Sequence, residues 1–162
     1  MVDEELKVIE KKVPWRLTQG IIENSEANNW VEAKKEWSFT HATFARLEDK
    51  EVCLCGHTPI VELCHLSNEH NRNEVIVGNV CVTKFMDIET PINKILPSLL
   101  RIKEKLSRSI NSEVLDIAVD KNLINNWELN FYWDTIRKRK LTLKQENIRK
   151  KINKKILNGL VE

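Results

Sequence analysis

Residues 51–86, EVCLCGHTPIVELCHLSNEHNRNEVIVGNVCVTKFM, contain all four cysteines of the 162-residue chain. The first two, Cys53 and Cys55, form a C-x-C-G sequence. Gly56 lets the backbone turn sharply there, so that both sulfurs can face one ion. Cys64 and Cys81 follow at larger spacings. Cysteines clustered in this way, in a chain without a recognisable secretion signal, more often bind metal than form disulfides.

The rest of the same stretch has the pattern of a hairpin followed by a helix. Two β-like runs, Ile60–Leu66 and Glu74–Val77, flank the polar segment Ser67–Asn73, which predicts a hairpin loop. Asn79 is a suitable N-cap for a helix whose first turn holds Cys81. The turn that begins with the C-x-C-G sequence at Cys53 is called the knuckle below. The order of knuckle, hairpin and helix predicts a small treble-clef-like zinc module.

Zinc takes four soft or borderline ligands in a tetrahedron, and thiolate is favoured among them. We therefore predict one structural zinc ion held by Cys53, Cys55, Cys64 and Cys81. Four protein ligands leave no open position for water, so such a site would not be catalytic. The tight C-x-C spacing leaves His57 or His65 as a substitute for one thiolate. The competing interpretation is four buried free cysteines.

Three regions are expected, and together they make the fold class α+β. Region 1–50 holds a helix and a lead-in strand, 51–90 is the zinc module, and 91–162 is all helical. In the first region we predict a helix capped by Ser25 and running to about Trp37, with loose alternation after it.

The helices of the last region are predicted from their capping residues. Ser112 and Asn126 are candidate N-caps, and Thr142 with Gln145 forms a T-x-x-Q capping box. The glycine of Asn158–Gly159 predicts the end of the final helix.

Charge divides the chain unevenly. The whole chain carries +2, but residues 137–155 contain ten Lys or Arg and one Glu, a local charge of +9, which leaves −7 elsewhere. Such a basic end fits a polyanion, although a solvated helix face is the alternative. The candidate binding residues are Arg137, Lys138, Arg139, Lys140, Lys144, Lys150, Lys151, Lys154 and Lys155.

An aromatic cluster precedes this basic stretch. Trp127, Phe131, Tyr132 and Trp133 could stack on bases. Clusters of this kind are more often part of a hydrophobic core, and we predict the core role.

Two groups of positions resemble known sequences. The cysteine stretch resembles a small zinc-binding module of uncharacterised bacterial and bacteriophage proteins, and 127–145 resembles a helical E..F....I..R.LT.KQ segment of phage and plasmid proteins. The resemblance covers about half of the chain and implies fold and metal more than activity. The matching positions are Cys53, Cys55, Gly56, Ile60, Cys64, Asn68, Val77, Gly78, Cys81, Phe85, Trp127, Glu128, Phe131, Ile136, Arg139, Leu141, Thr142, Lys144 and Gln145.

Enzymatic readings have little support in the sequence. Four glycines make a glycine-rich phosphate loop improbable. An H-N-H type nuclease would need a catalytic histidine with further ligands on the following helix. His65, Asn68, His70 and Asn71 suggest this reading, but no His or Asn follows Cys81 in that helix. We expect His41 and His70 to be ordinary histidines rather than ligands.

The sequence therefore predicts a non-enzymatic zinc-binding protein, of phage or mobile-element origin by resemblance. It would bind nucleic acid, or a machine that processes nucleic acid, through its basic C-terminal helices. The alternative is a protein-interaction module that inhibits or redirects a host enzyme, and a metal-dependent nuclease is the weaker alternative. The charged N-terminus, MVDEELKVIEKKV, is no signal peptide, and no apolar run could span a bilayer. We expect a cytoplasmic location.

Overall fold

The computed structural model describes residues 13–85 and 92–161. The charged N-terminal segment, which we expect not to be a signal peptide, lies outside these residues except for Val13. The first part of the chain is built around strands: α1 (Trp15–Glu23), α2 (Trp30–Ala33), a 3-10 turn (Lys34–Glu36), β1 (Trp37–Phe44), a second 3-10 turn (Leu47–Asp49), β2 (Glu62–Asn68), β3 (Glu74–Gly78) and α3 (Asn79–Phe85). The second part is helical: α4 (Ile92–Glu104), α5 (Ser112–Asp120), α6 (Asn126–Thr135) and α7 (Leu143–Leu160). The predicted α+β class is confirmed.

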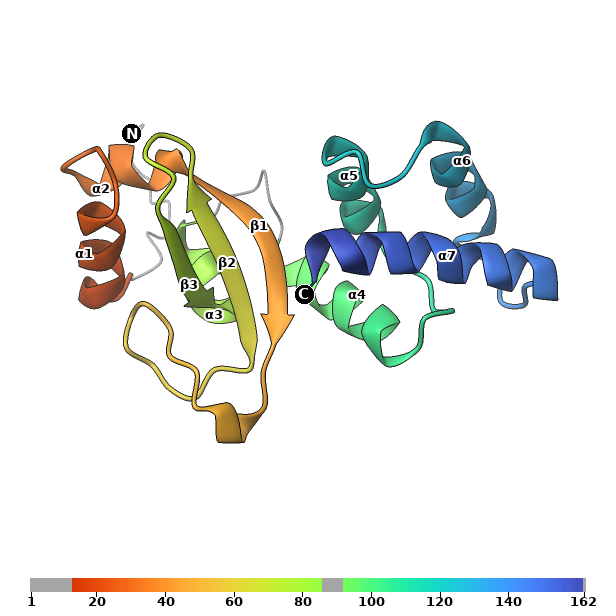
Figure 1. Ribbon diagram of the computed structural model, residues 1–162, viewed down its shortest axis with the longest axis horizontal. Helices are drawn as coiled ribbons and strands as arrows, with labels where there is room; N and C mark the ends of the chain where they lie inside the picture. Colours follow the sequence, from red (N-terminus) through yellow and green to blue (C-terminus); the bar gives the residue numbers. More distant parts are fainter. Residues whose placement is uncertain (1–12, 86–91, 162) are drawn as a thin grey trace, which may run out of the picture.

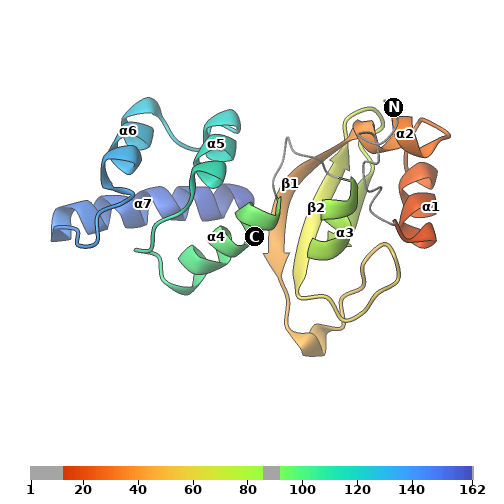
Figure 2. The same cartoon turned by 180° about the vertical axis from the view of Figure 1, so that it is seen from behind.

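The three strands form one antiparallel sheet in the order β1-β2-β3. The predicted hairpin is the β2–β3 pair, with Cys64 opposite Val77. β1 pairs with the other side of β2 and places Ala42 opposite Cys64. The expected boundary at residue 50 therefore falls between two strands that share a sheet. Helix α3 lies against one face of this sheet, and α4 to α7 lie beyond its β1 edge (Figures 1 and 2).

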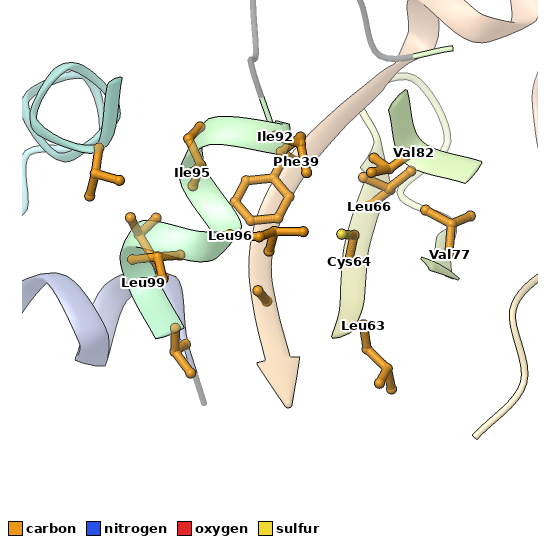
Figure 3. Packing of buried hydrophobic residues seen from close by; sticks show 14 of the residues in the cluster. Phe39, Leu63, Cys64, Leu66, Val77, Val82, Ile92, Ile95, Leu96 and Leu99 are labelled. Carbon is orange, nitrogen blue, oxygen red and sulfur yellow. The ribbon is translucent and has the colours of Figure 1, made fainter. Parts of the chain in front are cut away.

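One hydrophobic cluster connects the sheet to α3 and to the helices of the second part. Figure 3 shows Phe39 and Leu96 between the sheet and α4, with Leu66 and Val82 on the side of α3. These side chains are almost entirely buried. Removing this apolar surface from water is the main favourable term for folding, at roughly 25 cal/mol per Å². The sheet and the helical part consequently share one core.

The C-terminal helix docks on the outer strand through its last residues. Val161 makes an isolated parallel bridge with Ala42 of β1. Lys121, after α5, donates from Nζ to the carbonyl oxygens of Phe39 and Thr40 at 3.1 and 3.2 Å. These contacts cover the β1 edge, which would otherwise expose unpaired backbone groups.

The predicted helix from Ser25 to Trp37 is wrong. Only Trp30–Ala33 is α-helical, and it is capped by Asn29, whose side chain accepts from Glu32 N. Ser25 instead accepts a hydrogen bond from Trp37 Nε1 at 2.8 Å, and this bond ties the start of β1 to the end of α1. A side chain committed to a tertiary bond cannot cap a local helix, and the sequence gives no sign of that commitment.

The starts of α5, α6 and α7 were predicted within one residue. Asn111 and Asn125 are the caps in place of Ser112 and Asn126. The predicted capping box of Thr142 and Gln145 is confirmed.

The predicted stop at Gly159 is wrong, because α7 continues to Leu160. Leu160 is fully buried, and Val161 is needed at the β1 edge. Burial of these apolar residues outweighs the roughly 1 kcal/mol cost of a helical glycine. Among the described residues no helix combines the length and apolar character needed to cross a bilayer.

A buried polar network holds the helices of the second part together. Asn153, fully buried on α7, accepts from the Tyr132 hydroxyl at 2.7 Å. Its amide nitrogen donates to the carbonyl oxygens of Leu106 and Arg108, both at 2.7 Å. One amide thus satisfies the α4–α5 loop and α6 at once.

We predict that Asn153→Ala lowers the free energy of unfolding by about 2–4 kcal/mol, because it removes the buried acceptor of the Tyr132 hydroxyl and the amide that donates to the carbonyl oxygens of Leu106 and Arg108. Urea or thermal denaturation followed by circular dichroism measures the change. Asn147→Ala, at an exposed position of the same helix, is the control and should change stability by less than about 0.5 kcal/mol. Equal effects of the two substitutions would contradict the assigned role of Asn153.

Candidate metal centre

A tight loop presents the first two sulfurs. Cys53 N–H donates to the carbonyl oxygen of His57 at 2.9 Å, and Gly56 N–H donates to the carbonyl oxygen of Cys53 at 2.8 Å. Gly56 has φ +92°, a conformation that L side chains rarely adopt. A Cβ there would also lie 2.8 Å from Arg16 Nη1. The backbone conformation at this position therefore requires the glycine that the sequence predicted for the knuckle.

The knuckle is fixed to the end of β3. Leu54 N–H donates to the carbonyl oxygen of Ile76 at 3.1 Å, and Gly78 N–H donates to Cys53 Sγ at 3.2 Å. A Cβ on Gly78 would lie 3.3 Å from Ile60 Cγ2, so the approach is close. A backbone N–H that points at a sulfur favours the thiolate form, which is the form that binds metal.

The Sγ atoms of Cys53, Cys55 and Cys81 all lie within 4.8 Å of one another. Sulfurs in an ideal tetrahedron with bonds of about 2.3 Å to zinc would be about 3.8 Å apart, so a small contraction suffices. Cys81 comes from the first turn of α3, as predicted, and the other two come from the knuckle. These three cysteines could hold a metal ion between the knuckle and α3.

The thiols of this group differ in acidity. Burial opposes ionisation of Cys55, yet its pKa lies below the ordinary value. The His57 N–H, the thiols of Cys53 and Cys81, and the charge of Lys84 all favour its thiolate. Burial and the hydrogen bond to Cys55 raise the pKa of Cys81. The surroundings of Cys55 thus favour its thiolate, and a cation bound by the group would replace thiol protons.

Cys64, predicted as the fourth ligand, is not a member of this group. It lies in the middle strand, where its pairing with Ala42 and Val77 fixes the direction of its side chain. Figure 3 shows its sulfur among buried apolar side chains, near Leu66 and Leu96. Burial raises the pKa of Cys64 to about 12. The structure therefore brings together three of the four predicted ligands.

The two histidines considered as substitutes lie in different places. His57 lines the same pocket as the three cysteines, on the exposed part of the knuckle. His65 neighbours Cys64 on β2 and therefore points to the opposite face of the sheet. There its Nε2 lies 2.9 Å from Thr43 Oγ1, and its ring stacks on His41 with centroids 4.1 Å apart. Of the two, His57 shares a pocket with all three cysteines, whereas His65 lines another pocket, whose lining includes only Cys53 of the three.

The remaining residues considered for a nuclease site stabilise the turn between β2 and β3. Asn68 Nδ2 donates to Glu36 at 2.7 Å, and this bond, foremost among several, lowers the pKa of Glu36. Asn68 Oδ1 accepts from the backbone N–H groups of His70 and Asn71. Asn71 donates to the carbonyl oxygen of Asn24. These side chains connect the β2–β3 turn to the segment between α1 and β1, so each has a structural role.

Most of the predicted basic surface is exposed. Lys155 is exposed but bonds the largely buried Glu128 at 2.9 Å, and the half-buried Lys150 pairs with Glu146 at 3.5 Å. Arg149 is buried and donates to the carbonyl oxygen of Thr135. The exposed members of the predicted set are Arg137, Lys138, Arg139, Lys140, Lys144, Lys151, Lys154 and Lys155.

The core role predicted for the aromatic cluster is confirmed for Tyr132 and in part for Phe131, which is half-buried and packs against the core. Tyr132 is fully buried, whereas Trp127 is 61% and Trp133 48% exposed. Trp127 stacks on Phe131 with ring centroids 5.6 Å apart. On α6, Tyr132 faces the core, and the two tryptophans flank that face at helical spacing. Periodicity alone did not reveal which of the four aromatic positions are covered.

Comparison of the chain with protein-family models, with curated proteins and with solved structures finds no match. The resemblance to phage and plasmid sequences stays a prediction. The metal centre and the basic surface therefore have to be interpreted from their own chemistry.

We predict that Cys81→Ser lowers the metal content of the protein more than Cys64→Ala does. Cys81→Ser should also lower the melting temperature. The reason is that Cys81 belongs to the sulfur group and Cys64 does not. Elemental analysis beside thermal unfolding checks this. Loss of metal in Cys64→Ala equal to the loss in Cys81→Ser would restore the four-cysteine assignment.

Proposed function

We propose that the ion held by Cys53, Cys55 and Cys81 is zinc and that its role is structural. Three thiolates favour zinc among the divalent ions available to proteins. The sulfurs come from the knuckle and from the start of α3, on either side of the β2–β3 hairpin, so the ion joins segments distant in sequence. This order of segments supports the proposed treble-clef-like module, and metal binding would supply folding energy to it.

We further propose that the protein binds nucleic acid through α6, α7 and the turn between them. The observation that carries this proposal is the continuous run of exposed cations, Arg137–Lys140, placed directly between those helices. The remainder of the chain is acidic overall, so the net positive charge is concentrated in residues 137–155. Contacts of such residues with phosphates are independent of sequence.

The exposed tryptophans favour single strands as the ligand. Trp127 and Trp133 precede the basic run on α6, and both offer accessible rings. Unpaired bases stack on aromatic rings whatever their identity, while neighbouring cations hold the phosphates. Paired bases inside a duplex are not available for this contact.

A protein-interaction module is the second candidate. Leu143, at the start of α7, is 81% exposed, and with the two tryptophans it could form the apolar part of an interface. Affinity for such a partner would depend far less on salt than affinity for phosphates. Origin from a phage or mobile element and a cytoplasmic location remain part of the proposal that rests on the sequence resemblance.

We predict that replacing Arg137, Lys138, Arg139 and Lys140 with Gln weakens binding to both single-stranded and duplex oligonucleotides. The slope of log affinity against log salt should shrink by up to about 0.9 per lost phosphate contact on duplex DNA. Fluorescence anisotropy over a salt series measures both effects. The matched control removes four charges from the sheet half of the molecule, at Lys34, Lys35, Arg46 and Lys50, and should change little. A wild-type protein that binds no nucleic acid at low salt would favour the protein-partner candidate.

We also predict that Trp127→Ala or Trp133→Ala weakens single-strand binding by about 1–3 kcal/mol for each stacked base, with little effect on duplex binding. Trp15→Ala is the control, because Trp15 is 73% exposed on α1, beside the sheet. Quenching of intrinsic fluorescence by the bound strand gives an independent readout. Equal loss for duplex and single strand would contradict the stacking role.

A further inference from the structure

The metal centre has three sulfurs, whereas a structural zinc ion takes four protein ligands. A pocket of about 530 Å³ opens beside the sulfurs, so a further side chain has room to approach. Among the described residues that line this pocket, those with another side chain of a common zinc-ligand type are His57 and Glu62. The fourth ligand can be sought between these two.

The backbone of His57 is already fixed next to the cluster. Its N–H donates to Cys55 Sγ at 3.4 Å, and its carbonyl oxygen accepts from Cys53 N–H at 2.9 Å. The imidazole is one methylene away from this backbone, and His57 as a whole is exposed. Rotation about two side-chain bonds therefore changes the position of the ring while the hydrogen bonds of the knuckle persist.

We propose that His57 is the fourth ligand and closes a Cys53, Cys55, His57, Cys81 site around the ion. This inference rests on the proposed zinc function of the three cysteines. A Cys₃His set is one of the common structural zinc sets, and imidazole nitrogen is a borderline ligand that suits zinc. The knuckle C-x-C-G-H then supplies three ligands from five consecutive residues, and α3 supplies one.

The other nearby groups fit less well. Glu62 begins β2 and pairs with Phe44 of β1, so its backbone belongs to the sheet rather than to the knuckle. Cys64 would have to leave the apolar cluster of Figure 3 and disturb the pairing of the central strand. His65 faces the opposite side of the sheet from Cys64. His57 also lies outside the group of sulfurs within 4.8 Å, but a change of its side-chain rotamer would bring the ring toward the ion without a change in strand register.

Cobalt(II) substitution of the full-length protein tests the assignment, because the d–d bands report coordination geometry and the sulfur-to-cobalt charge-transfer bands report the number of thiolates. In the wild type we expect tetrahedral d–d bands with charge transfer from three thiolates. In His57→Ala we expect altered d–d bands, unchanged charge transfer, and affinity weaker by about tenfold or more.

Rescue makes the test specific. His57→Cys should restore tetrahedral d–d bands and increase the charge-transfer intensity, since a fourth thiolate enters the site. Glu62→Gln and Cys64→Ala are the controls and should leave both band systems as in the wild type.

Each remaining outcome overturns a defined statement. Unchanged d–d bands in His57→Ala, or loss of charge transfer in Cys64→Ala, would overturn the assignment of His57 and leave the zinc proposal standing. Altered d–d bands in Glu62→Gln would transfer the role to that carboxylate. A wild-type protein that takes up neither cobalt nor zinc would overturn the zinc proposal and this assignment together.

Discussion

The register of the central strand is the constraint on which the other features depend. β2 pairs on both sides, and this double pairing fixes which of its residues face α3. A shift of one residue would exchange Cys64 with His65 and expose an apolar face. The same pairing sets Leu63 opposite Gly78, whose N–H bonds Cys53. The position of the knuckle relative to α3, and with it the spacing of the three sulfurs, follows from this register.

The second half of the molecule depends on the sheet through its outer strand. Val161 and Lys121 bond the backbone of β1, and α4 places Leu96 against Phe39 in the common core (Figure 3). The α6–α7 surface is therefore carried on a rigid support. Inside this half, the amide of Asn153 joins α7 to α6 and to the α4–α5 loop, and so fixes the angle at which the basic turn is presented.

The two candidate sites lie in different halves of the molecule. The sulfur group lies between the knuckle and α3, whereas the exposed cations follow α6 on the other side of β1 (Figure 1). An ion at the first site would stabilise the sheet module without contacting a ligand at the second. The remainder of the chain is acidic overall, so the net positive charge is concentrated in residues 137–155.

Local patterns in the sequence were enough to predict the β2–β3 hairpin, the helix that carries Cys81, and the capping box of Thr142, because each depends on neighbouring residues alone. Gly56 and the pair Cys53 and Cys55 likewise predicted a metal-binding turn. Tertiary structure alone decided that Ser25 bonds Trp37, that α7 passes through Gly159 to reach β1, and that Trp127 and Trp133 stay exposed. It also placed Cys64 in the core and His57 beside the sulfurs. Which face a strand buries, and which side of a helix another helix covers, are set by residues distant in the chain, so no local pattern contains them.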